Sequence, residues 1–475
     1  MNGATTYSST LPARLDALPW SRWHWGVVIA LGVTWILDGL EVTVVGSLGP
    51  ALQQRATLGL TAAEIGLAGS IYVAGAVCGA LLFGRLADRF GRKRLFLVTL
   101  SVYLVATLLT AFTWNFSTFV LCRFLTGLGI GGEYAAINSA IDELIPARVR
   151  GSADLAINGS FWIGAAAGAA LSIVLLEPGR FDPNVGWRLA FVLGGVLAVA
   201  ILLVRRNLPE SPRWLMTRGR FAEAEEVVRQ IETNVARHHV LRTDHGPPFA
   251  IRVREHLSWS EIARLIVTRY RRRAVLGLTL MASQAFFYNA IFFTYALVLT
   301  NFFGVSAAGV GYYIFPFAIG NVLGPLVLGP WFDRIGRRKM IAATYALAGV
   351  GLLATAYAFD RQWLDAVSQA WCWSAIFFFA SAAASSAYLT VSEIFPLEMR
   401  AVAISLFYAI GTGVGGFIGP ALYGALIDSG NRGSLFWGYV VAAVLMCAAA
   451  VVALRIGVDA ERRSLETVAR PLSAA

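Results

Sequence analysis

Charged side chains are scarce in this chain of 475 residues: only 14% are Asp, Glu, Lys or Arg, whereas 57% are hydrophobic. The mean hydropathy is +0.64. A soluble protein of this length could not cover so much apolar surface, which excludes a water-soluble globular protein. The sequence also lacks a nucleophile–base constellation and a cofactor motif, so we expect no enzyme, no cofactor and no metal site.

Cysteine is sparse as well. The four cysteines show neither metal-ligand nor paired redox spacing, and each falls within an apolar segment. This pattern argues against a disulfide framework or a zinc site. We expect four free, buried thiols: Cys78, Cys122, Cys372 and Cys447.

What the chain does have is a series of long apolar runs. Each is close to the length of about 20 residues that an α-helix needs to cross roughly 30 Å of hydrocarbon. The runs predict an all-α membrane protein whose twelve transmembrane helices lie in the lipid bilayer. The expected ranges are 24–50, 63–87, 94–113, 116–141, 152–176, 187–205, 274–302, 306–331, 339–358, 365–391, 401–427 and 434–455.

The basic residues gather in alternate loops between these runs. A net charge of +11 would suit a nucleic-acid partner in a soluble protein. Here, with both termini placed in the cytoplasm, most Arg and Lys residues fall in the inner loops, as the positive-inside rule requires. The sequence therefore predicts a multi-pass protein of a bacterial-type inner (plasma) membrane, with cytoplasmic termini and no nucleic-acid partner. The basic loops span 89–94, 148–150, 269–273 and 334–339.

Two motifs occur twice in the chain. The first copies are GRLADRFGRKR at 84–94 and DELIPARVRG at 142–151, and the second copies are GPWFDRIGRRK at 329–339 and SEIFPLEMRA at 392–401. Duplicated halves with a site at their interface are typical of secondary transporters. We predict an N-terminal six-helix half at 1–205, a cytoplasmic linker with short helices at 206–273, a C-terminal six-helix half at 274–455 and a cytoplasmic tail at 456–475.

The repeated Asp-Arg-x-Gly-Arg-[Arg/Lys] loop resembles the signature of the major facilitator superfamily, and the likeness extends over nearly the whole chain. Within that superfamily, RFLTGLGIGG followed by ELIPARVRG, and PESPRWL at 209–215, resemble the sugar porters and their metabolite:proton symporter relatives. The resemblance implies the major facilitator fold, with two pseudo-symmetric six-helix halves around a central site. We expect this protein to act as a monomer.

The same resemblance implies a secondary active transporter that couples the import of a small polar organic metabolite to protons by alternating access. The metabolite would be sugar- or polyol-like, or an organic or aromatic acid. One alternative is a proton-coupled antiporter that exports organic cations or drugs. Another is a non-transporting membrane sensor on the same fold, which the carboxylates inside the predicted helices argue against.

Charged residues at the cytoplasmic ends of the helices are candidate gating residues. Carboxylates there would pair with nearby arginines, hold the inner gate shut in the outward-facing state and release it in the inward-facing state. Alternatively, they are helix-end charges in contact with water, and exposed ion pairs contribute only about 0–1 kcal/mol. The candidates are Asp88, Arg89, Arg92, Glu143, Arg150, Asp333, Arg334, Arg337, Glu393 and Arg400.

Two carboxylates, Asp38 and Glu41, interrupt the first apolar run and share one helix face. Glu41 and Arg123 are expected at matching depths, about 13 Å and 10 Å from the outer face, and the resemblance to proton-coupled sugar porters implies that they pair. A carboxylate whose arginine contact changes between two states would bind and release a proton once per cycle. We predict Glu41 as the proton carrier, Arg123 as its switch and Asp38 as a companion; alternatively, the Glu41–Arg123 pair is purely structural. Glu133 and Asp154 are each a candidate second proton site, substrate contact or gate residue.

Amide and aromatic residues of the central helices are candidate substrate contacts. The predicted second-half helices hold no Lys or Arg in their apolar parts, and Arg123 is already matched, which favours a neutral or weakly charged solute. The resemblance of DGLE and GGEY to aromatic-acid symporters favours an acid instead, so the substrate stays open. The candidates are Asn158, Trp162, Gln284, Tyr288, Asn289, Tyr295, Asn321 and Tyr388.

Overall fold

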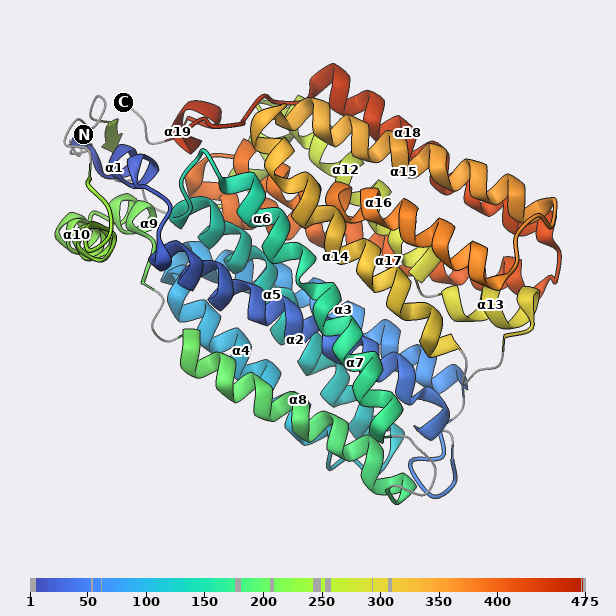
Figure 1. Cartoon of the computed structure of the whole chain (residues 1–475). Coiled ribbons are helices and arrows are strands. Elements are labelled where there is room, and N and C mark those ends of the chain that lie inside the picture. Colours follow the sequence, from blue (N-terminus) through green and yellow to red (C-terminus); the bar gives the residue numbers. More distant parts are fainter. Residues whose placement is uncertain are drawn as a thin grey trace.

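The computed structural model describes residues 6–52, 54–60, 62–175, 181–205, 209–241, 249–252, 258–292, 294–305, 310–470 and 472. Long helices run side by side in an elongated bundle (Figure 1). The first and last described helices, α1 (Leu11–Ala17) and α19 (Leu465–Val468), lie at the same end of the bundle. We call this end the termini end, and the other the opposite end.

Each of the twelve predicted runs corresponds to one long helix or to two helices in succession, so the twelve-helix architecture is confirmed. The expected limits agree with the helix bounds to within four residues. The first six positions hold α2 (Arg22–Leu52), α3 (Ala62–Phe90), α4 (Arg92–Thr110), α5 (Phe116–Leu144), α6 (Arg150–Gly159) with α7 (Phe161–Leu175), and α8 (Pro183–Arg205). The last six hold α12 (Arg271–Phe292) with α13 (Tyr295–Phe303), α14 (Val310–Arg334), α15 (Arg337–Asp360), α16 (Ala366–Ile394), α17 (Arg400–Asp428) and α18 (Arg432–Ile456).

The surface of the bundle suits a lipid environment. Within the described residues, ten helices are long and apolar enough to cross a membrane, and α12 and α17 occupy the two remaining positions. Large apolar side chains such as Leu121, Val196 and Trp437 are more than half exposed on the outside of the bundle. Apolar side chains that face outward along spanning helices are typical of a multi-pass membrane protein.

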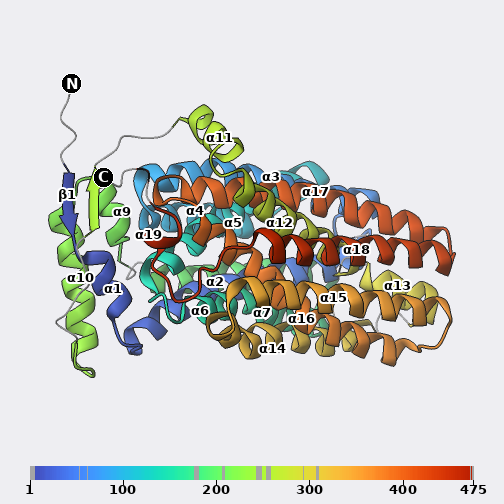
Figure 2. The ribbon, with the colours of Figure 1, turned by 90° about the horizontal axis from the view of Figure 1, so that it is seen from above.

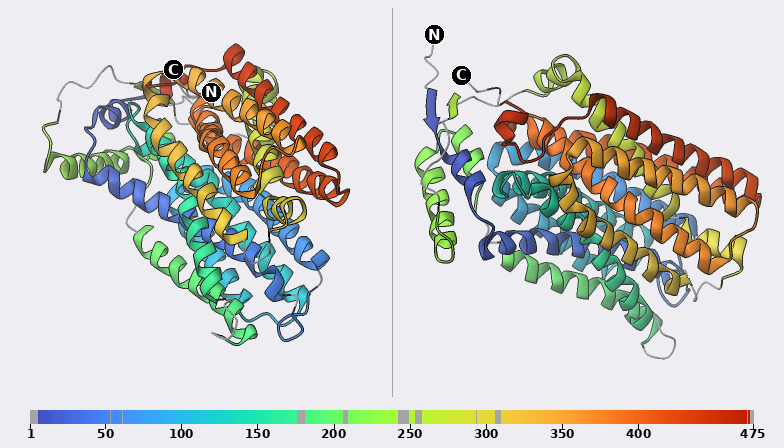
Figure 3. Two further views of the ribbon diagram at one scale, coloured as in Figure 1. Left: turned by 45° about the vertical axis from the view of Figure 1, so that its right-hand side comes forward. Right: turned by 45° about the horizontal axis from the view of Figure 1, so that its top comes forward.

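The two halves pack by equivalent rules. In the first half, α3 packs on α5, α2 on α7, and α4 on α8; in the second half, α14 packs on α16, α12 on α17, and α15 on α18. Between the halves, α3 packs on α17 and α14 packs on α6, and these two contacts also correspond in the repeat. Figures 1 and 3 show the blue-to-green helices and the yellow-to-red helices as two adjacent groups.

The repeated loop motif gives the same backbone turn in both halves. Gly91, between α3 and α4, has φ of 98°, and Gly336, between α14 and α15, has φ of 116°. Glycine adopts positive φ at little cost, whereas other residues rarely do. The glycine of each motif copy therefore allows the chain to turn directly from one long helix into the next.

Glycines of α5 bring it into close contact with α3, as expected for packing glycines. A Cβ atom on Gly127 would lie 2.1 Å from the Tyr72 carbonyl oxygen, and one on Gly131 would lie 1.9 Å from the Ala76 carbonyl oxygen. Both distances are far below van der Waals contact, so only glycine fits at these positions. This close packing holds Tyr72 of α3 near Tyr134 of α5, where both reach the central site.

A small layer at the termini end contains the elements outside the twelve spans (Figure 2). It includes α9 (Pro212–Thr217), α10 (Phe221–Ala236), and an antiparallel ribbon of β1 (Thr6–Ser9) and β2 (Phe249–Arg252). Another short helix, α11 (Trp259–Val267), precedes α12. The all-α prediction missed the ribbon, because two strands of four residues so far apart in sequence leave no local periodic signal. The predicted limits of the two six-helix halves, the cytoplasmic linker and the cytoplasmic tail stay predictions.

The cysteine prediction was partly wrong. All four thiols are free, but only Cys122 is buried. Cys78 is exposed, and Cys372 and Cys447 are partly exposed. A thiol within a spanning helix does not have to face the protein interior, because the lipid-facing side of such a helix is apolar as well.

Replacing Gly131 with Ala should destabilise the protein by on the order of 1–3 kcal/mol, because the added methyl group forces α5 away from α3. The matched control is Gly69→Ala in α3, where nothing lies within 4 Å of the added Cβ. Thermal unfolding of the purified variants in detergent measures both effects. Equal melting temperatures for the two variants would contradict the packing role of Gly131.

Candidate functional site

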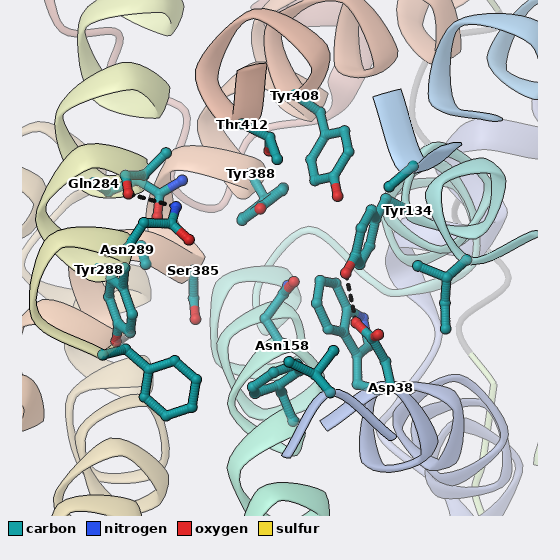
Figure 4. Close-up of a pocket in the computed structure, with 18 of the residues that line it drawn as sticks. Asp38, Tyr134, Asn158, Gln284, Tyr288, Asn289, Ser385, Tyr388, Tyr408 and Thr412 are labelled. Carbon is teal, nitrogen blue, oxygen red and sulfur yellow. Dashed lines mark hydrogen bonds between the residues drawn. The ribbon is translucent and has the colours of Figure 1, made fainter. Parts of the chain in front are cut away.

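A cavity of about 220 Å³ lies between the two halves. Side chains from both halves point into it (Figure 4). Its described lining comes from α2, α3, α5, α6 and α7 of the first half and from α12, α16 and α17 of the second half. The position is that of a central transport site, at the interface of the repeats and away from both ends of the bundle. The lining includes Trp35, Asp38, Tyr72, Tyr134, Asn158, Phe161, Trp162, Gln284, Tyr288, Asn289, Phe292, Ser381, Ser385, Tyr388, Tyr408 and Thr412.

Most of the predicted substrate contacts meet at this cavity. Asn321 lies behind the wall, where its Oδ1 accepts a hydrogen bond of 2.7 Å from the Tyr288 hydroxyl. Tyr295 is also outside the described lining, and its hydroxyl donates to the Tyr313 carbonyl oxygen. The predicted residues in the lining are Asn158, Trp162, Gln284, Tyr288, Asn289 and Tyr388. Their role in substrate binding stays a prediction.

Several lining residues of the second half were not predicted from the sequence. Ser381 and Ser385 lie on α16 with Tyr388, and Tyr408 and Thr412 lie on α17. The spacings of four, three and four residues place each set on one helix face, which is the signal that could have found them. Hydroxyl groups are common in helices for local reasons, so the spacing alone does not separate a cavity wall from an ordinary helix contact.

Aromatic rings form much of the cavity wall in two clusters. In the first, the Trp35 and Tyr134 ring centroids are 4.8 Å apart, and those of Tyr134 and Tyr408 are 4.5 Å apart. In the second, the Trp162 ring lies 5.1 Å from the Phe292 ring and 6.0 Å from the Tyr288 ring. Both clusters join residues of the two halves. The wall therefore offers π faces from several directions to a planar ligand.

Asp38 is a carboxylate in the cavity wall. Its Oδ2 atom accepts a hydrogen bond from the Tyr134 hydroxyl, and its Oδ1 atom accepts one of 3.2 Å from the Tyr72 hydroxyl. Figure 4 shows the Tyr134 contact and the position of Asp38 on the first-half side of the cavity. The two hydroxyl groups fix the orientation of the carboxylate and leave part of its hydrogen-bonding capacity for another donor.

Glu41 forms the expected ion pair with Arg123. Arg123 Nη1 donates to Glu41 Oε1 at 2.7 Å, and both side chains are less than 5% exposed. The other terminal nitrogen, Nη2, donates to the hydroxyls of Thr110 and Thr126, and the guanidinium group lies 4.8 Å from the Phe191 ring centre. Arg123 therefore has partners besides Glu41, and neither residue of the pair belongs to the described lining of the cavity.

The other two predicted carboxylates occupy different places. Glu133 is buried in α5 next to Tyr134, but it is outside the described cavity lining. Asp154 is fully buried in α6, and neither carboxylate oxygen accepts a hydrogen bond within the described residues. It lies one helical turn before Asn158, whose amide donates to the Asp154 carbonyl oxygen. The predicted role of each, as a proton site, a substrate contact or a gate residue, stays a prediction.

Ion pairs connect the two halves at the termini end. Arg150 of α6 lies 3.7 Å from Glu393 of α16, and Arg400 of α17 lies 3.8 Å from Glu143 of α5. The two contacts correspond in the repeat, and all four side chains are buried. Asp142, which the sequence analysis did not select, lies 4.0 Å from each of the two arginines, Arg150 and Arg400. Breaking this set of contacts would separate the halves at this end.

The second copy of the loop motif adds to these contacts. Arg337 is bonded to Glu393 at 3.0 Å and to Asp333 at 2.9 Å. Asp333 accepts hydrogen bonds from the backbone N–H groups of Gly151 and Ser152, at 3.1 Å and 2.7 Å, at the start of α6. A carboxylate at a helix start is favourable, because it satisfies N–H groups that have no partner within the helix. Asp333 thus attaches the second half to the first.

The remaining predicted gating residues are Asp88, Arg89, Arg92 and Arg334. Arg89 and Arg334 are exposed, and neither takes part in an ion pair among the described residues. The side chains of Asp88 and Arg92 lie outside the described part of the structure, so their predicted role has no structural account here. The arginines of the repeated loop motif thus differ in environment. Arg337 is buried in ion pairs, whereas Arg89 and Arg334 are exposed, as basic residues at the membrane surface are.

An outer layer of contacts, which the sequence analysis missed, covers the arginine cluster. Arg213 of α9 donates to the Glu143 carbonyl oxygen, to Asp16 in α1, and to Glu466 in α19. Asp16 also lies 3.4 Å from Arg150. Arg213 lies within the PESPRWL motif at 209–215, and that motif is the sequence signal that could have identified it. Asp16 lies in a short segment before the first span, where no pattern distinguishes it from other surface acids.

The Arg213–Glu466 contact is stable at neutral pH. Burial opposes the charged form of both groups, but the carboxylates of Glu466 and Asp16 raise the pKa of the Arg213 guanidinium, and Arg213 lowers the pKa of the Glu466 carboxyl. A lowered carboxyl pKa contributes stability above the ordinary pKa, and this contribution is lost as the pH falls through the lowered value. The Arg213–Glu466 contact should therefore weaken only under acidic conditions.

Comparison with known proteins gives the family of the chain. Residues 22–470 match the family described as "Sugar (and other) transporter". The chain belongs to this family. It is a major facilitator transporter of small organic metabolites rather than an enzyme. The match covers all twelve spans, the cavity and the termini-end ion pairs.

Individual relatives support this assignment. The transporter is 29% identical to the niacin transporter NiaP of Acinetobacter baylyi over 96% of this chain and 99% of that protein. It is 27% identical to the 4-hydroxybenzoate transporter PcaK of the same organism, over 95% and 94%. The structure of the proton:xylose symporter XylE bound to 6-bromo-6-deoxy-D-glucose is similar in fold, with a TM-score of 0.77, 18% identity, and coverage of 94% and 98%.

We expect neutralisation of Arg150 or Arg400 to open the termini end of the transporter. Arg150→Gln removes one of the two arginine partners of Glu393, and Arg400→Gln removes the arginine contact of Glu143. Each change should weaken closure by on the order of 1–3 kcal/mol, with the protein still folded. A cysteine at Ser385, in a background without native cysteines, should then react faster with a charged thiol reagent applied from the termini side. Transport should become slower.

Arg334→Gln is the matched control for this experiment, because Arg334 lies at the same end but is exposed. It should leave the reactivity unchanged. If both Arg150→Gln and Arg400→Gln also leave it unchanged, the ion pairs do not control access to the cavity.

Proposed function

We propose that the protein is a proton-coupled importer of a small aromatic metabolite. The observation that carries this proposal is the buried Glu41–Arg123 pair, which lies one helical turn from an aromatic-walled cavity between the two halves. Buried ionisable groups inside spanning helices are rare and costly, and they mark ion or proton pathways in membrane proteins.

An aromatic substrate is supported by the wall and by the relatives. The first cluster includes Trp35 and Tyr134, and the second includes Trp162, Tyr288 and Phe292. Two relatives along nearly the whole chain are named for niacin and 4-hydroxybenzoate, which are single aromatic rings. Stacking on rings and hydrogen bonds to the amides of Asn158, Gln284 and Asn289 would fit such a molecule.

Glu41 is the proposed proton carrier. While it is bonded to Arg123, its charge is compensated inside the bundle. If the contact opens during the transport cycle, Arg123 keeps Thr110, Thr126 and the Phe191 ring as partners. Glu41 keeps the neutral Thr107 hydroxyl at 3.3 Å but loses its counter-ion, so it needs a proton to stay buried. Glu41 would therefore take up and release one proton per cycle, and Arg123 would control the exchange.

The termini-end ion pairs are the proposed gate. They would close the cytoplasmic side while the cavity takes substrate from outside, and they would break as the halves rock. The gate would consist of Glu143, Arg150, Asp333, Arg337, Glu393 and Arg400. The exposed Arg89 and Arg334, at the ends of α3 and α14, would lie outside it, and a gating role for Asp88 and Arg92 stays a prediction.

We place the termini end in the cytoplasm and the protein in the plasma membrane. The basic loops at 89–94, 148–150, 269–273 and 334–339 lie at the termini end, as the positive-inside rule requires of the cytoplasmic side. The two halves of the chain face each other across the cavity, and we propose a monomer as the working unit. The proposed partners are thus a small molecule, protons and lipid.

The replacement Glu41→Gln should abolish uphill accumulation and keep substrate binding and exchange, because an amide resembles only the protonated carboxyl. The measurement is uptake into proteoliposomes under an imposed pH gradient. A labelled aromatic probe is first selected by thermal shift from nicotinate, nicotinamide and 4-hydroxybenzoate. Wild-type protein should concentrate the probe, and the variant should only equalise it across the membrane.

The control is Glu226→Gln, the same chemical change at a partly exposed position of α10 outside the spans, which should accumulate the probe normally. If Glu41→Gln still concentrates the probe and Asp38→Asn does not, Asp38 is the carrier. If both still concentrate it, these carboxylates are structural and the proposed coupling is wrong.

A further inference from the structure

The described cavity wall holds an acidic side chain but no basic one. Among the described residues of the lining, Asp38 is the only carboxylate, and none is Lys, Arg or His. The other polar groups are amides and hydroxyls, which are neutral. A bound molecule therefore meets one negative group and no positive side chain in the described wall.

The arginines closest to the site along the chain are engaged elsewhere. Arg123 is 1% exposed, is bonded to Glu41, Thr110 and Thr126, and is outside the described lining. Arg150 and Arg400 are bonded to carboxylates at the termini end. An anionic ligand would have to displace one of these contacts to gain a counter-ion.

This arrangement disfavours an anionic ligand and favours a ligand that carries a hydrogen-bond donor. A carboxylate ligand in a site of low dielectric would lose its hydration and would be repelled by Asp38. An ammonium group or an N–H donor would instead bind the Asp38 carboxylate, as a charge-assisted hydrogen bond. The Tyr134 and Trp35 rings beside Asp38 add π faces that attract a cation.

The opposite wall completes the recognition of such a molecule. Figure 4 shows Gln284, Asn289 and Ser385 across the cavity from Asp38. Their amide and hydroxyl groups donate as well as accept, so they suit neutral polar substituents at the far end of a ring. A ligand with a nitrogen donor on one side and a neutral polar group on the other would match both walls.

We propose that the cavity selects aromatic substrates that carry a nitrogen donor and no net negative charge, and that Asp38 binds the donor. This inference rests on the proposed aromatic substrate, departs in charge from the ring carboxylates for which two relatives are named, and divides the two carboxylates of α2 by role. Asp38, in the cavity wall, recognises the substrate; Glu41, behind the wall, couples transport to protons. The hydroxyls of Tyr72 and Tyr134 occupy one position on each Asp38 oxygen, which leaves lone pairs for the ligand.

The test uses the wild-type protein and ligands that share one ring and differ in a single substituent. Isothermal titration calorimetry at neutral pH compares benzamide and benzylamine with benzoate, and nicotinamide with nicotinate. We expect the amine or amide of each set to bind at least about tenfold more tightly than the carboxylate, as a hydrogen bond to a charged group would give. Equal affinities, or tighter binding of benzoate and nicotinate, would overturn the proposal.

Two variants assign the preference to Asp38. Asp38→Asn should remove most of the tenfold preference, since it removes the charge and keeps the shape. Glu226→Gln, a similar change on α10 outside the cavity lining, should preserve it. A preference that survives in folded Asp38→Asn would overturn the role of Asp38. Because this test measures binding, and the coupling test measures uphill accumulation, failure of one is distinguishable from failure of the other.

Discussion

Every charge inside the bundle has to be compensated, because neither lipid nor closely packed helices supply the water that would solvate it. The rest of the structure follows from how each charge meets this requirement. Glu41 is compensated by Arg123 within the first half, and Asp38 by two tyrosine hydroxyls. Arg150 and Arg400 are compensated by carboxylates of the opposite half. The contacts between halves must break when the halves rock, whereas the Glu41–Arg123 contact lies within one half and answers to protonation, which separates gating residues from coupling residues.

The duplication of the two halves explains the paired ion contacts of the gate, but it does not explain the lining of the cavity. The pairs Arg150–Glu393 and Arg400–Glu143 are related by the repeat, so one evolved contact serves twice around the same axis. The cavity is asymmetric: its carboxylate comes from α2, whereas α12 and α16 supply amides and hydroxyls. A site with a charged wall and a neutral wall can orient a substrate, which a symmetric site could not.

Long-range order that depends on periodicity was predictable from the sequence. Twelve apolar runs gave the helices, and the depth of Glu41 and Arg123 along two helices gave their ion pair, because helical rise converts residue number into distance. Features that depend on side-chain direction or on short segments were not predictable. Asn321 has a suitable side chain but bonds to Tyr288 behind the wall, and Asp16 and the strand β1 precede the first span without any local signal.

The central claim is that Glu41 is the group that changes its protonation during transport. Infrared difference spectroscopy of the purified transporter tests it directly, by recording the carbonyl stretch of a protonated carboxyl group while the pH is stepped. The account predicts a band that vanishes in Glu41→Gln and persists in Glu133→Gln. A band that is unchanged in Glu41→Gln would contradict it.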